Sequence, residues 1–330
     1  MIRKNLFHIC DMLNLKYMSL VRFIKHKYII SLIIFIIITA YFLVVNQKQI
    51  NQHHKLNIFD LSGPLAPAAI YSQIECNKSA TILISTLLCI HSKEYDSIGV
   101  SGTIRNHGFW EGHVLIPFMN YLYENPDWLF IDAGANIGQY TLFAARLGTN
   151  VVAIEPYHPN IQRIHKAAFT EKTFEKIILI KNALSNKRNE IRQLHRDHIN
   201  IGAQGLLMNK ATFTKLDKNN DYQVETILFD DIVPYLPKKY KKAILKIDIE
   251  GFEIYAFQNA QLLFDTLDIR IVFMEWAHLS KQLNEMSKII YLIDFFYTRN
   301  YEPFDFTMKT ILKKDSWQTW TADVVWKKKI

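Results

Sequence analysis

The sequence predicts an α/β protein with a mostly parallel, doubly wound sheet that is closed by an antiparallel C-terminal hairpin. Predicted strands and helices alternate from residue 128 to residue 275, the pattern of parallel strands joined by crossover helices. A glycine-rich turn joins the first of these strands to its helix. A third observation, the uncharged 18-residue segment 28–45, adds one predicted N-terminal transmembrane helix.

The composition suits one folded domain with an anchor. The chain has 330 residues, 49% of them apolar, which is enough for one large core. Its net charge of +8 is concentrated near the N-terminus, where residues 1–55 carry eight Lys or Arg against one Asp. The rest of the chain is nearly neutral, so the sequence offers no electrostatic surface for nucleic acid, and we expect no nucleic-acid partner.

The N-terminal segments predict a signal anchor. The apolar run 28–45 ends in Leu-Val-Val-Asn-Gln, without the small residues of a signal-peptide cleavage site. Basic residues before the run exceed those after it, which favours a cytosolic tail at 1–27 and a lumenal body. Residues 46–75 are polar, then rich in Pro and Ala, and predict a stem. The catalytic domain is expected at 76–330.

Three features bear on this topology. Asn77-Lys78-Ser79 is a sequon for an N-linked glycan, which is added only in the lumen. Cys76 and Cys89 follow the anchor, and the sequence leaves open whether they form a disulfide or remain free thiols. The C-terminal Lys-Lys-Lys-Ile resembles a cytosolic retrieval signal and keeps the opposite orientation open. We expect a single-pass type II protein of the Golgi or endoplasmic reticulum.

The elements of the domain follow from apolar runs and their boundaries. Runs rich in β-branched residues predict strands at 81–91, 128–132, 150–155, 176–184, 243–249 and 269–275. Longer periodic segments predict helices at 117–124, 137–147 and 160–169. The runs 304–312 and 319–327 predict the two strands of the closing hairpin.

The most informative motif is residues 130–141, Phe-Ile-Asp-Ala-Gly-Ala-Asn-Ile-Gly-Gln-Tyr-Thr. A buried strand ends at Asp132 and a glycine turn opens a helix, at the edge of the sheet where doubly wound folds bind ligands. The next strand ends at Glu155, about 20 residues further on, where an acidic residue accepts hydrogen bonds from ribose hydroxyls. The pair predicts an adenosine-bearing ligand.

The loop itself narrows the choice of ligand. A dinucleotide-binding loop has glycines where this chain has Asn136 and Gln139, and a phosphate-binding Gly-Lys-Ser/Thr motif is absent. S-adenosylmethionine carries a ribose but no phosphate, so a bulkier loop suits it. An acid such as Asp132 can also serve its ammonium group.

A second acidic motif, residues 245–253, reads Leu-Lys-Ile-Asp-Ile-Glu-Gly-Phe-Glu. Asp248 and Glu250 follow a predicted strand, so we expect them beside the pocket as candidate catalytic bases. Glu275 ends the next strand and is a third candidate. Glu253 fits the start of a helix as well as it fits a functional role.

Together these motifs resemble the FkbM-type methyltransferases. Asp-Ala-Gly-Ala-Asn-Ile-Gly at 132–138 and Lys-Ile-Asp-Ile-Glu-Gly-Phe-Glu at 246–253 are similar to that family's pattern, as are residues 182–185 and 225–231. The resemblance covers residues 95–305 and implies a class I, Rossmann-like methyltransferase fold. It also implies S-adenosyl-L-methionine as methyl donor and O-methylation of a hydroxyl group.

The resemblance also assigns residues to the donor site. Those implied to hold the donor are Asp132, Gly134, Asn136, Gly138 and Glu155, and those implied to approach its adenine are Asn182 and Ser185. The chain departs from the family pattern at Phe229, where Leu is common.

We expect the acceptor to be a glycan hydroxyl, because an anchor, a stem and a lumenal catalytic domain are the layout of glycan-modifying enzymes. Two alternatives stay open: a membrane-tethered scaffold on an inactive methyltransferase fold, and a cytosol-facing methyltransferase of lipid or protein. The histidines, including His278 just past Glu275, lack the spacing of a metal site, so none is expected to bind a metal.

Overall fold

The computed structural model describes residues 55–197, 201, 204–207 and 212–329. Lys55–Ile330 forms one compact unit. The expected cytosolic tail, the transmembrane segment 28–45 and the first part of the stem lie outside the described residues. Within the described ranges, no helix has the length and apolar character needed to cross a membrane.

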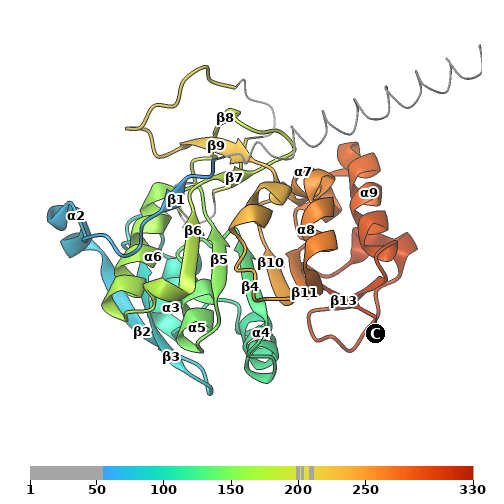
Figure 1. Ribbon diagram of the computed structural model, residues 1–330, viewed down its shortest axis with the longest axis horizontal. Helices are drawn as coiled ribbons and strands as arrows, with labels where there is room; N and C mark the ends of the chain where they lie inside the picture. The colour runs from blue at the N-terminus through green and yellow to red at the C-terminus, as the bar shows by residue number, and fades with distance from the viewer. Residues whose placement is uncertain (1–54, 198–200, 202–203, 208–211, 330) are drawn as a thin grey trace, which may run out of the picture. The chain divides into compact units, whose positions relative to one another are not determined.

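One eight-stranded sheet organises the domain (Figure 1). Its strands lie in the order β1-β6-β5-β4-β10-β11-β13-β12. Four neighbouring pairs, from β6 across to β11, are parallel, while β1, β13 and β12 run antiparallel to their neighbours. The strand bounds are Ile58–Phe59 (β1), Leu129–Ala133 (β4), Val151–Ile154 (β5), Ile177–Ile180 (β6), Lys242–Ile247 (β10), Asp268–Glu275 (β11), Tyr301–Asp305 (β12) and Asp323–Lys328 (β13).

The strand order establishes the fold class. Leaving out β1, the other seven strands can be numbered along the chain, with β4 as strand 1 and β13 as strand 7. Across the sheet they lie in the order 3-2-1-4-5-7-6, and strand 7 is antiparallel to its neighbours. This is the class I methyltransferase-like arrangement, so the predicted mostly parallel sheet with an antiparallel C-terminal end is confirmed. The order reverses between β4 and β10, and such sheets bind their ligands at the carboxyl ends of the strands beside this reversal.

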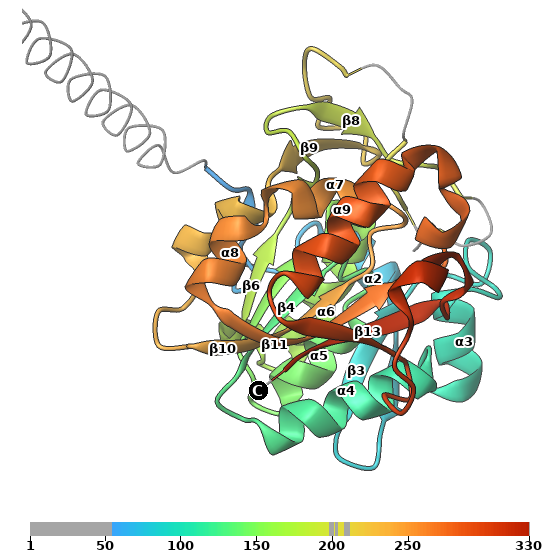
Figure 2. The same ribbon diagram turned by 90° about the vertical axis from the view of Figure 1, so that its right-hand side faces the viewer.

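Helices cover both faces of this sheet (Figure 2). Side chains of β4 alternate between two hydrophobic cores: Leu129 and Ile131 join the core under α7–α9, and Phe130 joins the core under α3–α6. Because both faces are buried, the strands read as continuous apolar runs. The α-helices are Ala68–Gln73 (α2), Val100–His107 (α3), Gly112–Glu124 (α4), Gln139–Arg146 (α5), His158–Thr170 (α6), Glu253–Ala256 (α7), Gln261–Thr266 (α8) and Met286–Tyr297 (α9).

Short elements connect these layers. The 3-10 helices are Phe174–Lys176 (η1), Phe229–Tyr235 (η2), Phe257–Asn259 (η3), Leu279–Lys281 (η4), Leu283–Glu285 (η5) and Lys314–Thr319 (η6). A three-stranded sheet of Ala183–Leu184 (β7), Gln223–Ile227 (β9) and Ile191–Gln193 (β8) lies at the top of the view in Figure 1.

Residues 55–75, which we expected in the stem, belong to the compact unit Lys55–Ile330. The two-residue strand β1 pairs antiparallel with β6 at the edge of the main sheet. The Asn182 side chain accepts a hydrogen bond from the Asn57 backbone at 2.9 Å. A strand of two residues is too short to show an alternating pattern in the sequence. It forms because its backbone pairs with β6.

Two predicted strands are also corrected. The run 176–184 divides into β6 and β7, which belong to different sheets. The first strand of the closing hairpin, predicted at 304–312, is β12 at Tyr301–Asp305. The chain turns back after β12, and Phe304 and Ile311 form an isolated antiparallel bridge. The predicted helix at 117–124 begins earlier, at Gly112, and contains Pro117 in its interior.

A second hairpin packs on the helical layer. Glu75–Ala80 (β2) and Ser85–Ile90 (β3) pair antiparallel, with Cys76 opposite Cys89. A disulfide joins these two cysteines, which decides between the two alternatives that the sequence left open. The adjoining His91 is buried and forms a hydrogen bond with Asn160 of α6 at 2.8 Å, so the hairpin is tied to the sheet's helices.

Candidate active site

The glycine turn after β4 is shaped by close contact with the end of β10. Gly134 has φ +85°, and a Cβ there would lie 1.8 Å from the Asp248 carbonyl oxygen. Its amide and that of Ala135 donate to the Ile154 carbonyl at 2.9 and 3.0 Å. Only glycine satisfies both the left-handed backbone and the contact. The turn therefore joins the ends of three neighbouring strands.

Glu155 is held beneath this turn by backbone amides. Its carboxylate accepts hydrogen bonds from the Asn136 and Tyr157 amides, both at 2.8 Å, and from the Asn160 side chain at 3.3 Å. Burial outweighs these bonds and raises the pKa of Glu155 to about 8. A carboxylate has about four lone-pair positions, so at least one remains to accept from a ligand hydroxyl.

A first cavity opens between the glycine turn, Glu155 and the small three-stranded sheet. Its polar lining includes Glu155, Asp248 and Glu250, and Leu206 with Phe252 contributes apolar surface. The predicted site residues among its lining are Gly134, Asn136, Glu155, Asn182, Asp248 and Glu250. The cavity therefore offers a ribose acceptor at one end and flat apolar walls for a base.

A second cavity lies on the other side of the same turn. Gly134, Asn136, Asp248 and Glu250 line both cavities, so the two meet there. The second cavity is also lined by Trp110, Glu111, Gln139, Tyr140, Lys246 and Glu275. Two adjoining spaces that share one wall can bring a donor and an acceptor together.

Four acidic side chains surround the second cavity, and one lysine offsets them. Lys246 is buried on β10, with its Nζ 3.0 Å from Asp248 Oδ2 and 4.7 Å from the centre of the Tyr140 ring. Burial alone would lower the pKa of Lys246, but Asp248 and other acidic neighbours outweigh it and raise the pKa. Lys246 therefore stays charged and holds Asp248 at the junction of the cavities.

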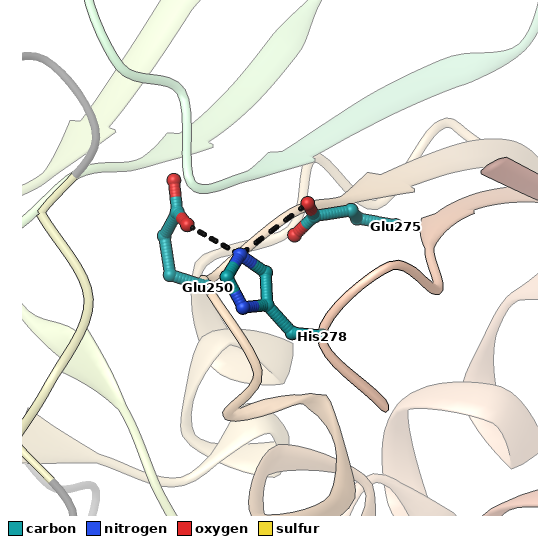
Figure 3. A group of neighbouring side chains, drawn as sticks. All are labelled: Glu250, Glu275 and His278. Atoms are coloured by element: carbon teal, nitrogen blue, oxygen red, sulfur yellow. Dashed lines mark ion pairs between the residues drawn. The ribbon is translucent and has the colours of Figure 1, made fainter. Parts of the chain in front are cut away.

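Glu250, Glu275 and His278 form a cluster at the edge of the second cavity (Figure 3). His278 Nε2 lies 3.0 Å from Glu250 Oε2 and 3.6 Å from Glu275 Oε1. Burial, reinforced by the charges of Asp248 and nearby glutamates, raises the pKa of Glu275 well above its usual range. One potential ligand atom from each member lies within 4.8 Å of the others, so this group is able to hold a metal ion.

Three predicted site residues lie outside the lining of both cavities. Asp132 is buried behind the turn, where its carboxylate accepts from Thr141 at 2.6 Å, and burial raises its pKa to about 6. Gly138 has φ +88° and begins α5. Ser185 is buried, and its backbone amide donates a hydrogen bond to the Ile227 carbonyl. Asp132 and Gly138 therefore shape the strand end and the helix start on either side of the turn.

The other predicted acids also have structural contacts. The Glu253 carboxylate accepts from the Ile249 amide at 2.8 Å, which closes the turn before α7 and fits the helix-start interpretation. Asp231 pairs with Arg188 at 2.6 Å, and Asp230 accepts from the Leu263 amide at 2.9 Å. Phe229, the departure from the family pattern, is buried in the core beneath them.

Sequence reasoning missed the wall formed by Trp110 and Glu111. The buried Gln139 side chain accepts from the Trp110 amide at 2.7 Å and donates to the Trp110 carbonyl at 3.0 Å. This pair of bonds fixes the segment against the start of α5. Burial raises the pKa of Glu111 to about 7. The signal available in the sequence was Gln139 itself, a long polar residue at a position where nucleotide loops prefer glycine.

Tyr140 and Lys246 were missed as well. Tyr140 is buried, and its hydroxyl has no hydrogen-bond partner among the described residues. Lys246 lies within the apolar part of a predicted strand, and a buried lysine needs a charged partner, so its position was a readable sign of the ion pair with Asp248.

Comparison with known proteins gives a family match. The methyltransferase FkbM domain matches residues 132–303, which include both acidic motifs. No curated protein sequence matches the chain.

Among solved structures, the chain is similar to three methyltransferases at low identity. An rRNA methylase from Streptococcus thermophilus has 12% identity and a TM-score of 0.35 over 66% of this chain and 98% of that one. Precorrin-6y C5,15-methyltransferase from Geobacter metallireducens has 9% identity and a TM-score of 0.33 over 66% and 87%. Monomeric WbdD has 12% identity and a TM-score of 0.39 over 72% and 46%.

Proposed function

The chain belongs to the FkbM methyltransferase family, and from this premise we propose that it methylates a hydroxyl group of a glycan. The observation that carries the proposal is the pair of cavities that meet at Gly134, Asn136, Asp248 and Glu250. S-adenosyl-L-methionine, when bound, supplies a methyl group on a sulfonium centre. The first cavity takes this donor and the second takes the acceptor.

The lining of the first cavity fits the donor. Glu155, fixed by two backbone amides, accepts from the ribose hydroxyls with its remaining lone pairs. The wall of Ala183, Leu206 and Phe252 suits an adenine ring. We place Asn182 beside that ring, although its amide also bonds Asn57 and the Glu225 carbonyl.

The second cavity fits a neutral, hydroxyl-rich acceptor. Glu111, Asp248 and Glu250 present carboxylate oxygens, which accept hydrogen bonds from hydroxyls and repel anions. Trp110 supplies an aromatic surface on which the apolar face of a sugar can pack. This combination supports an uncharged sugar over a phosphate or a uronic acid.

The reaction needs a base as the hydroxyl oxygen attacks the methyl carbon. The O–H bond breaks as the new C–O bond forms, the carbon–sulfur bond breaks, and a carboxylate receives the proton. Asp248, Glu250 and Glu275 were the expected candidates, and Glu111 joins them. All four line the second cavity, and we choose Glu111 because burial raises its pKa to about 7, near the pH at which a base works best.

The proposed setting is the lumen of the Golgi or endoplasmic reticulum, with segment 28–45 as a type II anchor. The Cys76–Cys89 disulfide supports an oxidising compartment. Asn77 lies next to it in β2 and is proposed to carry an N-glycan.

A labelled transfer assay tests the proposal. The full-length protein is incubated with methyl-labelled S-adenosylmethionine and neutral oligosaccharides, anionic oligosaccharides, lipid vesicles or protein extract. We expect label on the neutral glycans, and a Glu111→Gln variant about 100-fold slower in kcat. The exposed Glu124 of α4 supplies the matched control, Glu124→Gln, which keeps the wild-type rate. Label confined to lipid or protein would favour the cytosol-facing alternative.

A further inference from the structure

We propose that Glu250, Glu275 and His278 form a binding site for one divalent transition-metal ion at the wall of the second cavity. The three side chains converge from two segments of the chain (Figure 3). Glu250 lies in the turn after β10, Glu275 is the last residue of β11, and His278 immediately precedes η4. Because β10 and β11 are parallel neighbours, their carboxyl ends carry both glutamates to one edge of the sheet.

The spacing of the ligand atoms fits a metal centre. Bonds of about 2.1 Å separated by angles of about 90–110° place neighbouring ligand atoms about 3.0–3.4 Å apart. His278 Nε2 lies 3.0 Å from Glu250 Oε2 and 3.6 Å from Glu275 Oε1. All three ligand atoms lie within 4.8 Å of one another. Small side-chain rotations therefore suffice to complete the site.

The surrounding backbone holds two of the ligands in place. Gly251 has φ +90°, and a Cβ there would lie 3.2 Å from His278 Cβ. A Cβ on Gly205 would lie 2.6 Å from Glu250 Cβ. Glycines at both positions let the chain pack directly against the bases of the ligand side chains, which fixes where these side chains start.

The hydrogen bonding of the cluster is incomplete without a cation. A single Nε2–H can donate fully to one carboxylate, and the distances favour Glu250. Glu275 Oε2 is buried and has no hydrogen-bond partner among the described residues. Lys246, the nearby ammonium, is already bonded to Asp248. A divalent ion would bind one oxygen of each glutamate together with the imidazole nitrogen.

The ligand set points to Mn²⁺, Fe²⁺, Co²⁺ or Zn²⁺, since imidazole suits these ions while Mg²⁺ and Ca²⁺ prefer oxygen ligands alone. Three protein ligands leave at least one coordination position open. Glu250 and Glu275 line the second cavity, so an ion between them borders the space assigned to the acceptor. If the proposed function holds, the open position binds an acceptor oxygen and orients it.

Metal binding can be measured without knowing the acceptor. The full-length protein is dialysed against chelator and titrated separately with Mn²⁺ and Zn²⁺ by calorimetry, with Mn²⁺ binding also followed by electron paramagnetic resonance. We expect one saturable site per chain for at least one of the two ions. Glu275→Gln and His278→Gln each weaken it at least tenfold, and the exposed His107→Gln binds like the wild type.

Absence of saturable binding, or equal binding by the wild type and both variants, would overturn the site. Thermal unfolding of each variant establishes that it is folded. Titration with S-adenosylhomocysteine is run in parallel, because Glu275 and His278 lie outside the lining of the first cavity. A variant that loses metal but keeps S-adenosylhomocysteine separates this site from the donor site. A wild-type protein that does not bind S-adenosylhomocysteine would instead count against the proposed function.

Discussion

At the scale of single residues, the site depends on a few backbone positions that side chains cannot occupy. Gly134 lets the end of β10 touch the donor turn, and Glu155 ties that turn to β5 through the Asn136 amide. These contacts explain why both acidic motifs, separated by more than 100 residues in the sequence, act on one site. The glycine turn after β4 is held in shape because its backbone amides donate hydrogen bonds to the end of β5.

Replacing Gly134 tests this contact. Gly134→Ala introduces a Cβ that would lie 1.8 Å from the Asp248 carbonyl, so we expect a loss of at least about 3 kcal/mol in the free energy of unfolding. Gly148→Ala is the matched control: its φ is +93°, but nothing lies within 4 Å of the added Cβ. It should cost only the left-handed backbone term, about 1–2 kcal/mol. Denaturant unfolding measures both, and equal losses would contradict the contact.

At the scale of elements, the β2–β3 hairpin is fixed to the helical layer by a buried histidine and stapled by a disulfide. His91 is bonded to Asn160 of α6, and Asn160 in turn bonds Glu155 of the donor site. The hairpin thus supports α6, the helix that follows β5 and Glu155.

The buried histidine predicts a pH dependence. Burial lowers the pKa of His91 to about 3, below the value of about 6.5 in an unfolded chain. The neutral form is favoured in the folded state, so its contribution to stability is present above pH 6.5 and is lost as the pH falls toward 3. We expect about 2 kcal/mol to be lost by pH 5.

A His91→Gln variant keeps a hydrogen-bonding side chain but cannot titrate. Its free energy of unfolding should therefore fall less than that of the wild type between pH 7 and pH 5, when both are measured by denaturant unfolding. His107→Gln, at an exposed position, keeps the wild-type slope. Identical slopes for all three proteins would show that His91 is not the titrating group.

The elements also show how far the sequence could be interpreted. The donor turn, Glu155 and the Asp248–Glu250 motif were predictable because each is a local pattern at a strand end. Glu111 was not, since α4 brings it to the cavity through packing against the sheet. Strand β1 was assigned to a stem because two residues carry no pattern. Asp132 carries the strongest motif signal, yet lies behind the cavity wall, because alternation along β4 turns its side chain into the core.

At the scale of the whole molecule, the compact class I unit spans Lys55–Ile330 and follows, along the chain, the segments predicted as anchor and first part of the stem. The disulfide and the sequon lie side by side in β2, at Cys76 and Asn77. If the domain is lumenal, we expect two modifications in β2: the disulfide at Cys76 and an N-glycan at Asn77.

Glycosidase treatment of the protein from eukaryotic cells tests the orientation. We expect the wild type to shift to a lower apparent mass on treatment and Asn77→Gln to run at that lower mass without it. Ser79→Ala, which removes the sequon but keeps Asn77, should behave in the same way. An unmodified wild type with reduced cysteines would contradict the lumenal orientation.

Calorimetric titration of the full-length protein with S-adenosylhomocysteine tests the central claim, that the first cavity is a methyl-donor site. We predict one binding site per chain, with affinity reduced at least tenfold in Glu155→Ala and unchanged in the exposed Glu124→Ala. A folded wild-type protein that does not bind S-adenosylhomocysteine, or a Glu155→Ala variant that binds it with wild-type affinity, would contradict the account.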